Sequence, residues 1–195
     1  MKFRELFETH TGRPSVKHHA YPEIYDAYLS CFKGKAPVVL EIGVGQGGSL
    51  EIWRDYFGEG SRIIGIDKDK KTWFTDDRID IVIGDQSDRE FLYTIGSSYG
   101  PFDIIIDDGS HKSSHQEVGF TDLMPFLKDP GVYMIEDINY FDGPRPALLK
   151  EHEYRYHENI LVVLRGGNIV ECNPKIRSGE RRDGKANASP SLAAE

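Results

Sequence analysis

From residue 38 onward, short apolar runs alternate with stretches of helical periodicity. A continuous apolar run of about five residues is typical of a strand buried on both faces, as in a parallel sheet. Helical stretches between such runs predict right-handed crossovers between parallel strands. The pattern predicts strands at 38–42, 62–66, 79–83, 102–106 and 131–135, and helices at 49–56, 87–95 and 114–127.

The two ends of the chain follow other patterns. Apolar side chains recur at helical spacing within residues 1–35, so a helical lead-in or lid is expected there. Near the other end, apolar runs at 159–164 and 168–172 flank an Arg-Gly-Gly turn, which predicts an antiparallel hairpin. Residues 175–195 are small and polar, and we expect a disordered tail after a single domain over 1–174.

Charge and composition narrow the classes of partner. The chain has 195 residues, a net charge of -8 and two cysteines. An acidic chain argues against a nucleic-acid or anionic membrane partner, and no apolar run approaches the roughly 20 residues of a membrane helix. Two cysteines are too few for a disulfide framework, and their spacing fits no zinc motif. We therefore expect a cytoplasmic protein with a small-molecule substrate, and neither nucleic acid nor membrane as partner.

A glycine-rich loop at 43–48 joins the first predicted strand to the first predicted helix. Glycine lets the backbone turn sharply and lets a ligand approach the main chain, and loops in this strand-to-helix context bind nucleotide-like cofactors. We therefore expect Gly43, Gly45, Gly47 and the following Ser49 to contact a cofactor. A tight turn without a ligand is the alternative.

Acidic residues stand where further cofactor contacts are expected. Asp67 ends the second predicted strand about 20 residues after the loop, where a carboxylate accepts hydrogen bonds from both ribose hydroxyls. A helix cap or a solvated turn is the alternative for Asp67. Glu41, at the end of the first strand, would repel the pyrophosphate of a nicotinamide cofactor and attract the cationic groups of S-adenosylmethionine. The glycine loop and Asp67 are also compatible with a nicotinamide-dependent oxidoreductase, which is the second hypothesis.

Three carboxylates follow the fourth and fifth predicted strands. Asp108 comes after the strand at 102–106, and Glu136 and Asp137 come after the strand at 131–135. Ligands bind at the carboxyl ends of parallel strands, so these acids are expected to meet there. Crowded carboxylates repel one another unless a cation intervenes, and Mg²⁺ or Mn²⁺ prefers oxygen ligands. Helix capping in contact with water is the alternative.

A histidine accompanies the acids. His111 lies three residues after Asp108, and a neutral imidazole can take a proton from a hydroxyl near neutral pH. A bound metal ion would acidify that hydroxyl. His115 is the alternative base. The pattern therefore predicts His111 and Asp108 as catalytic residues.

Five runs together resemble one family: VVLEIGVGQGGSLEIWRDYF, IIGIDKD, GDQSD, FDIIIDDGSH and GVYMIEDI. It is the family of metal-dependent sugar O-methyltransferases of macrolide biosynthesis, of the macrocin and mycinamicin type. Its relatives include rhamnosyl O-methyltransferases and so-called cephalosporin hydroxylases. The likeness extends over about residues 17–138. It implies an α/β, Rossmann-like class I methyltransferase fold, with a mostly parallel seven-stranded sheet and a C-terminal antiparallel hairpin.

The resemblance also implies roles for individual residues. Asp108, Glu136 and Asp137 match the family's metal ligands, and His111 matches its general base. The remaining cofactor contacts are expected from residues after the third and fourth strands: Asp85, Gln86, Ser87 and Asp107. Capping of the following helix is the alternative for Asp85.

These expectations define one function and two alternatives. We expect S-adenosylmethionine-dependent, Mg²⁺-assisted methylation of a sugar hydroxyl in a natural-product glycoside, a sugar nucleotide or a polysaccharide, by a chain that forms homo-oligomers. The oxidoreductase named above is one alternative. A non-catalytic binding module of methyltransferase fold is the other, and the crowded carboxylates disfavour it because a scaffold does not need them.

Overall fold

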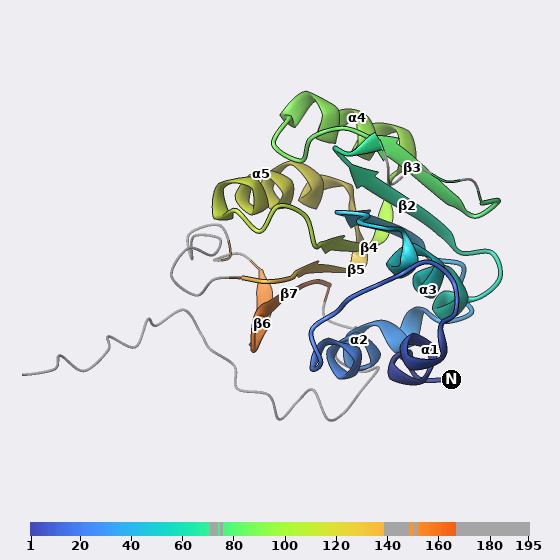
Figure 1. Cartoon of the computed structure of the whole chain (residues 1–195). Coiled ribbons are helices and arrows are strands. Elements are labelled where there is room, and N and C mark those ends of the chain that lie inside the picture. Colours follow the sequence, from blue (N-terminus) through green and yellow to red (C-terminus); the bar gives the residue numbers. More distant parts are fainter. Residues whose placement is uncertain (71–73, 75, 139–148, 150–151, 167–195) are drawn as a thin grey trace, which may run out of the picture.

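The computed structural model describes residues 1–70, 74, 76–138, 149 and 152–166. Within them, seven strands form one sheet in the order β3-β2-β1-β4-β5-β7-β6 (Figure 1). The first five strands are parallel, and β7 runs antiparallel to β5 and β6. The strands are Val38–Ile42 (β1), Arg62–Asp67 (β2), Ile79–Ile83 (β3), Phe102–Asp107 (β4), Leu127–Ile135 (β5), Glu153–His157 (β6) and Ile160–Arg165 (β7).

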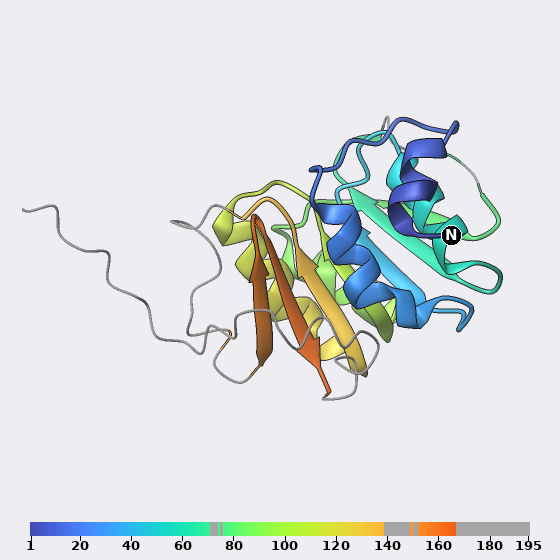
Figure 2. The same ribbon diagram turned by 90° about the horizontal axis from the view of Figure 1, so that it is seen from below.

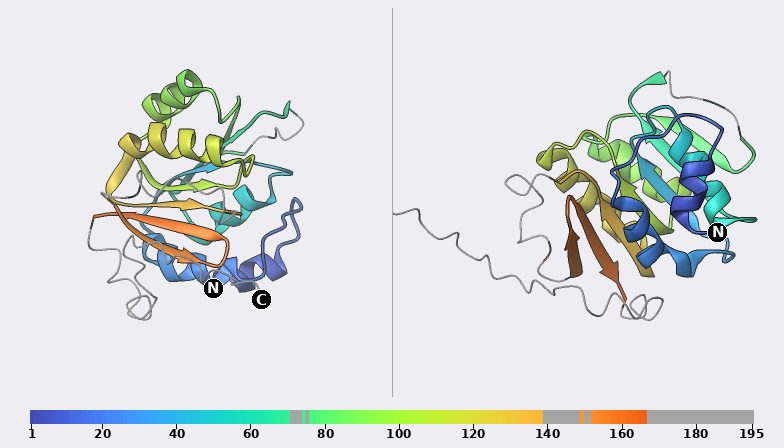
Figure 3. Two further views of the ribbon diagram at one scale, coloured as in Figure 1. Left: turned by 90° about the vertical axis from the view of Figure 1, so that its left-hand side faces the viewer. Right: turned by 60° about the horizontal axis from the view of Figure 1, so that its bottom comes forward.

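Helices cover both faces of the sheet. α4 and α5 lie on one face, and α1, α2 and α3 lie on the other (Figures 1 and 3). Seen from below, the lead-in helices α1 and α2 lie against the face turned to the viewer (Figure 2). The helices are Phe3–Thr9 (α1), Tyr21–Leu29 (α2), Gly48–Phe57 (α3), Arg89–Tyr99 (α4) and Ser113–Leu123 (α5), with 3-10 turns at Ser30–Phe32 and Met124–Phe126.

Alternation along the strands divides the core into two layers. Ile104 and Ile106 of β4 pack toward the lead-in and α3, whereas Ile105 packs toward α4 and α5. In β5, Met134 belongs to the first layer and Ile135 to the second. Because side chains on a strand alternate between faces, Asp108 and Glu136, two positions after Ile106 and Met134, are expected to face the lead-in.

The predicted architecture is confirmed, with local differences. β7 occupies the strand predicted at 159–164, but its hairpin partner is the preceding β6, which the sequence analysis missed. β6 is a half-buried edge strand with the sequence EYRYH, and its polar side chains hide the strand pattern. The other predicted arm, 168–172, and the tail, 175–195, lie outside the described residues.

The predicted helix at 114–127 is too long, because Pro125 falls in a 3-10 turn and β5 then begins at Leu127. Residues 1–35 are helical over much of their length, as expected. In the part of the chain that the structure describes, no helix has the length and apolar character to cross a membrane.

Candidate functional site

The glycine loop after β1 is folded against the ends of two neighbouring strands. Gly43 has a φ of +89°, and a Cβ added to it would lie 2.1 Å from the carbonyl oxygen of Asp108, so only glycine fits there. Asp67, the last residue of β2, accepts hydrogen bonds from the backbone nitrogens of Val44 (2.9 Å) and Gly45 (3.1 Å). The acid predicted to bind ribose therefore also fixes the loop.

A pocket of about 320 Å³, the Asp85 pocket, opens beyond the ends of the strands. At its base, the amide of Gln86 donates to both carboxylate oxygens of Asp107 at 2.9 Å, and the amide oxygen accepts from the nitrogen of Ser110 at 2.9 Å. Burial raises the pKa of Asp107 to about 6, although the Gln86 bonds favour its charged form. The pocket is lined by Ile42, Gly43, Ile66, Asp67, Lys68, Gly84, Asp85, Gln86, Gly109, Ser110, Lys112 and His115.

Asp85 and Ser87 form a local turn at the rim of this pocket. One oxygen of Asp85 accepts from the backbone nitrogen and the hydroxyl of Ser87, both at 2.8 Å. These bonds, the backbone one first, lower the pKa of Asp85. The N-cap of α4 is Asp88, which accepts from the nitrogens of Glu90 and Phe91. Asp85 is therefore not the helix cap and is available to the pocket.

A second pocket, the Lys17 pocket, has a volume of about 390 Å³ and adjoins the first. The two share Gly43, Asp67 and Gly109, so one ligand lying across the glycine loop can occupy both. Part of the lead-in forms one of its walls. Its lining residues are Pro14, Ser15, Val16, Lys17, Gly43, Val44, Gly45, Gln46, Ser49, Asp67, Asp108, Gly109 and His111.

The ammonium of Lys17 lies among three carboxylates from three neighbouring strands. Its Nζ atom is 2.6 Å from Asp108 Oδ2, 3.0 Å from Glu136 Oε2 and 3.3 Å from Glu41 Oε1. Strand alternation explains the convergence, because Glu41, Asp108 and Glu136 lie two positions after Val39, Ile106 and Met134, which all face the lead-in. The Lys17 side chain is only 2% exposed.

Burial and charge shift the pKa values of this cluster. Burial raises the pKa of Glu41 to about 7 and also raises the pKa of Glu136, while Lys17 opposes both shifts. Burial alone would lower the pKa of Lys17, but the carboxylates, with Glu136 first, raise it well above its usual value. The Lys17 ammonium therefore stays charged. Within the described residues, the buried Oε2 atom of Glu41 has no hydrogen-bond partner.

Asp137 is held by a different residue of the lead-in, Tyr21. The hydroxyl of Tyr21 donates to Asp137 Oδ1 at 2.6 Å and accepts from the Asp137 nitrogen at 3.1 Å. Asp137 and His111 have φ values of 51° and 56°, in the left-handed region that is uncommon without glycine. The Nε2 atom of His111 lies 3.8 Å from Asp137 Oδ2.

The acids therefore separate into two overlapping groups. Asp108, Asp137 and His111 bring one ligand atom each within 4.8 Å of one another. Their two carboxylates suit a hard divalent cation, and the imidazole of His111 lies beside them, so Asp108 and Asp137 fit the predicted metal. The carboxylate of Glu136 instead contacts Lys17 and accepts from the buried hydroxyl of Tyr25. A metal ion would have to share Glu136 with them.

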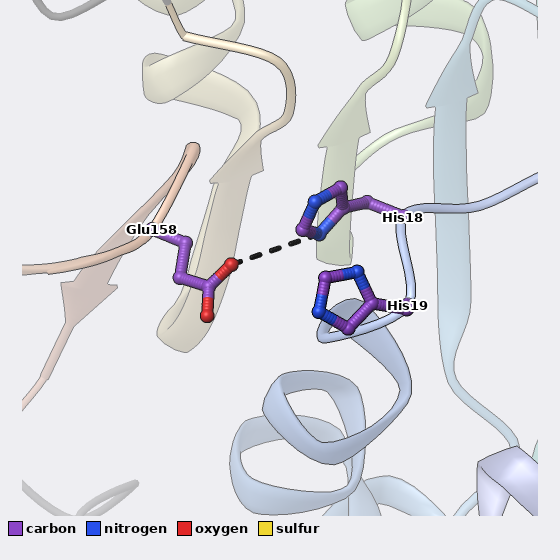
Figure 4. Close-up of side chains that lie close together, drawn as sticks. All are labelled: His18, His19 and Glu158. Carbon is purple, nitrogen blue, oxygen red and sulfur yellow. Dashed lines mark ion pairs between the residues drawn. The ribbon is translucent and has the colours of Figure 1, made fainter.

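The other histidines of the site region have separate surroundings. His115 contacts the hydroxyl of Ser110 at 2.9 Å and lines the Asp85 pocket, away from the acids. His18 and His19 form a second group with Glu158, which lies in the turn between β6 and β7 (Figure 4). Their ligand atoms also lie within 4.8 Å of one another, and the His18 Nδ1 atom is 3.8 Å from Glu158 Oε2.

The predicted site residues divide into those that line a pocket and those that do not. Gly43, Gly45, Ser49, Asp67, Asp85, Gln86, Asp108 and His111 line one or both pockets. Among the described residues, the other predicted ones lie outside both linings: Glu41, Gly47, Ser87, Asp107, Glu136 and Asp137.

Three residues of the site were missed by the sequence analysis. Lys17, Tyr21 and Tyr25 recur every four residues: Lys17 lies in the segment before α2, and Tyr21 and Tyr25 lie one turn apart on α2. Each of them contacts at least one acid of the cluster. A lysine and two tyrosines at a spacing of four residues in the lead-in are the signal that could have identified them.

Comparison with known proteins adds sequence relatives, although no protein-family model matches the chain. The chain is 39% identical to the 8-demethyl-8-(2-methoxy-alpha-L-rhamnosyl)-tetracenomycin-C 3'-O-methyltransferase of Streptomyces olivaceus, with 65% of this chain and 36% of that protein covered. It is 41% identical to the mycinamicin VI 2''-O-methyltransferase of Micromonospora griseorubida, with 62% and 32% covered. The chain spans about a third of the length of these curated relatives, which are sugar O-methyltransferases.

Solved structures share the fold. The chain superposes on the MycE methyltransferase of the mycinamycin pathway, in complex with Mg, SAH and mycinamycin VI, with a TM-score of 0.75 and 29% identity over 86% of this chain and 54% of that one. A putative caffeoyl-CoA O-methyltransferase from Staphylococcus aureus matches with a TM-score of 0.58 and 15% identity over 84% of this chain and 90% of that one. The Rossmann-like methyltransferase fold implied by the resemblance is therefore confirmed.

We predict that Lys17→Met lowers the free energy of unfolding by about 3–5 kcal/mol, because it leaves buried carboxylates without their cation. Urea denaturation followed by circular dichroism measures the change. Lys35→Met is the matched control, because Lys35 is exposed. Equal stability of the two variants would contradict a net role for the Lys17 ion pairs.

We also predict that the stability falls as the pH rises from 5.5 to 7.5. The folded-state pKa of Glu41 is about 7 against an ordinary value of 4.5, so the folded chain binds the extra proton between these values. Stability gained by that proton is lost as the pH rises, with a slope of at most about 1.36 kcal/mol per pH unit for one group.

Glu41→Gln should therefore make this pH dependence shallower, whereas Glu59→Gln, at an exposed turn, should leave it unchanged. Denaturant midpoints at pH 5.5, 6.5 and 7.5 provide the test. Identical slopes for both variants and the unaltered chain would show that Glu41 does not titrate in this range.

Proposed function

We propose that this chain binds S-adenosylmethionine and transfers its methyl group to a hydroxyl of a sugar-containing acceptor. One observation carries the proposal: two pockets meet across the glycine loop, and the second ends at Asp108 and His111, next to Asp137. The methyltransferase fold and the sequence relatives support it, since those relatives methylate sugars of glycosylated natural products.

The two pockets suit the two halves of the cofactor. In this proposal the Asp85 pocket takes the adenosine, with Asp67 directed at the ribose and Gln86 and Asp85 at the base. The Lys17 pocket takes the methionine part, whose sulfonium is attracted by the nearby carboxylates. The sulfonium would therefore lie on the Asp108 and His111 side of the glycine loop.

His111 supplies the base of the proposed reaction. The acceptor oxygen forms a bond to the methyl carbon while the carbon–sulfur bond breaks, and the hydroxyl proton passes to the imidazole of His111. Asp137, 3.8 Å from the His111 Nε2 atom, stabilises the imidazolium that results. His115 is the weaker candidate for this role, because it lies in the Asp85 pocket and contacts Ser110.

A divalent cation, Mg²⁺ or Mn²⁺, is part of the proposal. Asp108 and Asp137 would hold it, with Glu136 as a third ligand shared with Lys17. When bound, such an ion acidifies a coordinated hydroxyl and orients it. The presence of Mg and SAH in the MycE complex supports this assignment.

The acceptor class is inferred from the relatives alone. A glycoside of a natural product fits best, and a sugar nucleotide or a polysaccharide sugar is the alternative. Assembly into homo-oligomers and a cytoplasmic location stay predictions. A nicotinamide oxidoreductase stays the alternative function, and it is disfavoured because Glu41, an acid, stands two residues before the first glycine of the loop.

Calorimetric titration with S-adenosylhomocysteine tests the cofactor directly. We expect micromolar binding both with Mg²⁺ and with excess chelator, because the Asp85 pocket lies apart from the metal acids. NADH, titrated in parallel, should not bind. Binding of NADH without binding of S-adenosylhomocysteine would replace this function with the oxidoreductase.

His111→Ala should reduce turnover by about 10²–10⁴-fold, because that is the usual contribution of a positioned base. Affinity for S-adenosylhomocysteine should stay within about twofold of the unaltered value. Methyl transfer to rhamnosylated acceptors of the kind the relatives use is the assay, and His19→Ala, at an exposed histidine outside both pockets, is the control. Full activity of His111→Ala would exclude His111 as the base.

A further inference from the structure

The lead-in contributes directly to the acid cluster through side chains of α2 and of the segment before it. Lys17 contacts Glu41, Asp108 and Glu136, and Tyr25 donates to Glu136. These contacts hold the carboxylates of Glu41, Asp108 and Glu136 in place. The carboxylate of Asp137 is contacted by Tyr21, which lies between Lys17 and Tyr25 in the sequence.

Tyr21 fixes Asp137 in two ways at once. Its hydroxyl donates to the carboxylate at 2.6 Å and accepts from the backbone nitrogen of the same residue at 3.1 Å. The same hydroxyl lies 3.3 Å from the carbonyl oxygen of Asn159, which ties it to the turn before β7. The Tyr21 ring is 1% exposed, so the hydroxyl is held in place by packing.

This double contact matters because Asp137 is in an unusual backbone conformation. A φ of 51° is uncommon for any residue other than glycine, although aspartate adopts it more readily than most, and it persists where surrounding contacts maintain it. In this conformation Asp137 faces His111 and Asp108, with ligand atoms within 4.8 Å. An extended conformation at this position would change the direction of its carboxylate.

We propose that Tyr21 is a positioning residue of the reaction centre: by holding the backbone and the carboxylate of Asp137, it aligns Asp137 with Asp108 to receive a divalent cation beside His111. The inference rests on the proposed function for the metal, but it concerns a residue of the lead-in to which that function assigns no role. Tyr21 does not itself touch the cation or the acceptor. The lead-in is then part of the reaction centre and not only a cover for the sheet.

The test is Mn²⁺ binding to the full chain, measured by electron paramagnetic resonance with S-adenosylhomocysteine present. Tyr21→Phe removes one oxygen and keeps the buried ring, so the fold is retained. Tyr28→Phe is the matched control, because Tyr28 is equally buried on the same helix and its hydroxyl contacts His157, away from the acids. All chains carry His19→Ala, so that the His18, His19 and Glu158 group does not bind the probe.

We expect Tyr21→Phe to weaken Mn²⁺ binding about tenfold, since a hydrogen bond to a charged group is lost. Tyr28→Phe should bind Mn²⁺ as the chain with His19→Ala alone does, and both tyrosine variants should bind S-adenosylhomocysteine with unchanged affinity. Unchanged Mn²⁺ affinity in Tyr21→Phe would overturn the inference, as would an equal loss in Tyr28→Phe.

Two further outcomes separate this inference from the proposed function. If the unaltered site binds S-adenosylhomocysteine but no Mn²⁺, the positioning role of Tyr21 toward a cation is refuted while the cofactor assignment stands. If Mn²⁺ binds and depends on Tyr21 but S-adenosylhomocysteine does not bind, Tyr21 keeps its role and the methyltransferase proposal fails.

Discussion

The ion pairs of Lys17 are the interaction on which the rest of the site depends. Strand alternation brings Glu41, Asp108 and Glu136 onto the face of the sheet that the lead-in covers, and a buried carboxylate without a cation is costly. The ammonium of Lys17 offsets that cost. Because Lys17 belongs to the lead-in, the same contacts that allow the acids to be buried also hold the lead-in against the sheet, where it forms a wall of the second pocket.

The glycine loop connects the two halves of the proposed chemistry. Its backbone is fixed by Asp67 on one side and approaches the carbonyl of Asp108 on the other. A ligand across the loop is therefore placed relative to the acids by the main chain and not by flexible side chains. Such placement suits methyl transfer, because much of the rate of a direct displacement comes from aligning the reacting atoms.

The sequence predicted the sheet well because buried strands leave continuous apolar runs, two of which, β2 and β4, end at acids. It missed β6, whose tyrosines and charges resemble a loop. It grouped Asp108, Glu136 and Asp137 by their position after two strands, yet alternation directs Glu136 toward Lys17, while Tyr21 and a left-handed backbone turn Asp137 toward His111. Those directions depend on contacts across more than 100 residues, which local patterns do not contain.

The contact between Lys17 and Glu136 joins residues 119 positions apart. Long-range contacts form late, because the entropy of closing the loop is lost before the contact stabilises anything. During synthesis Lys17 is made before β5, so its contact with Glu136 forms only after residue 136 has been added. A nascent chain that has reached only β4 already carries the glycine loop and Asp67, but Glu136 and Asp137, which complete the acid cluster, are still to come. The acid cluster is therefore completed only once β5 has been synthesised.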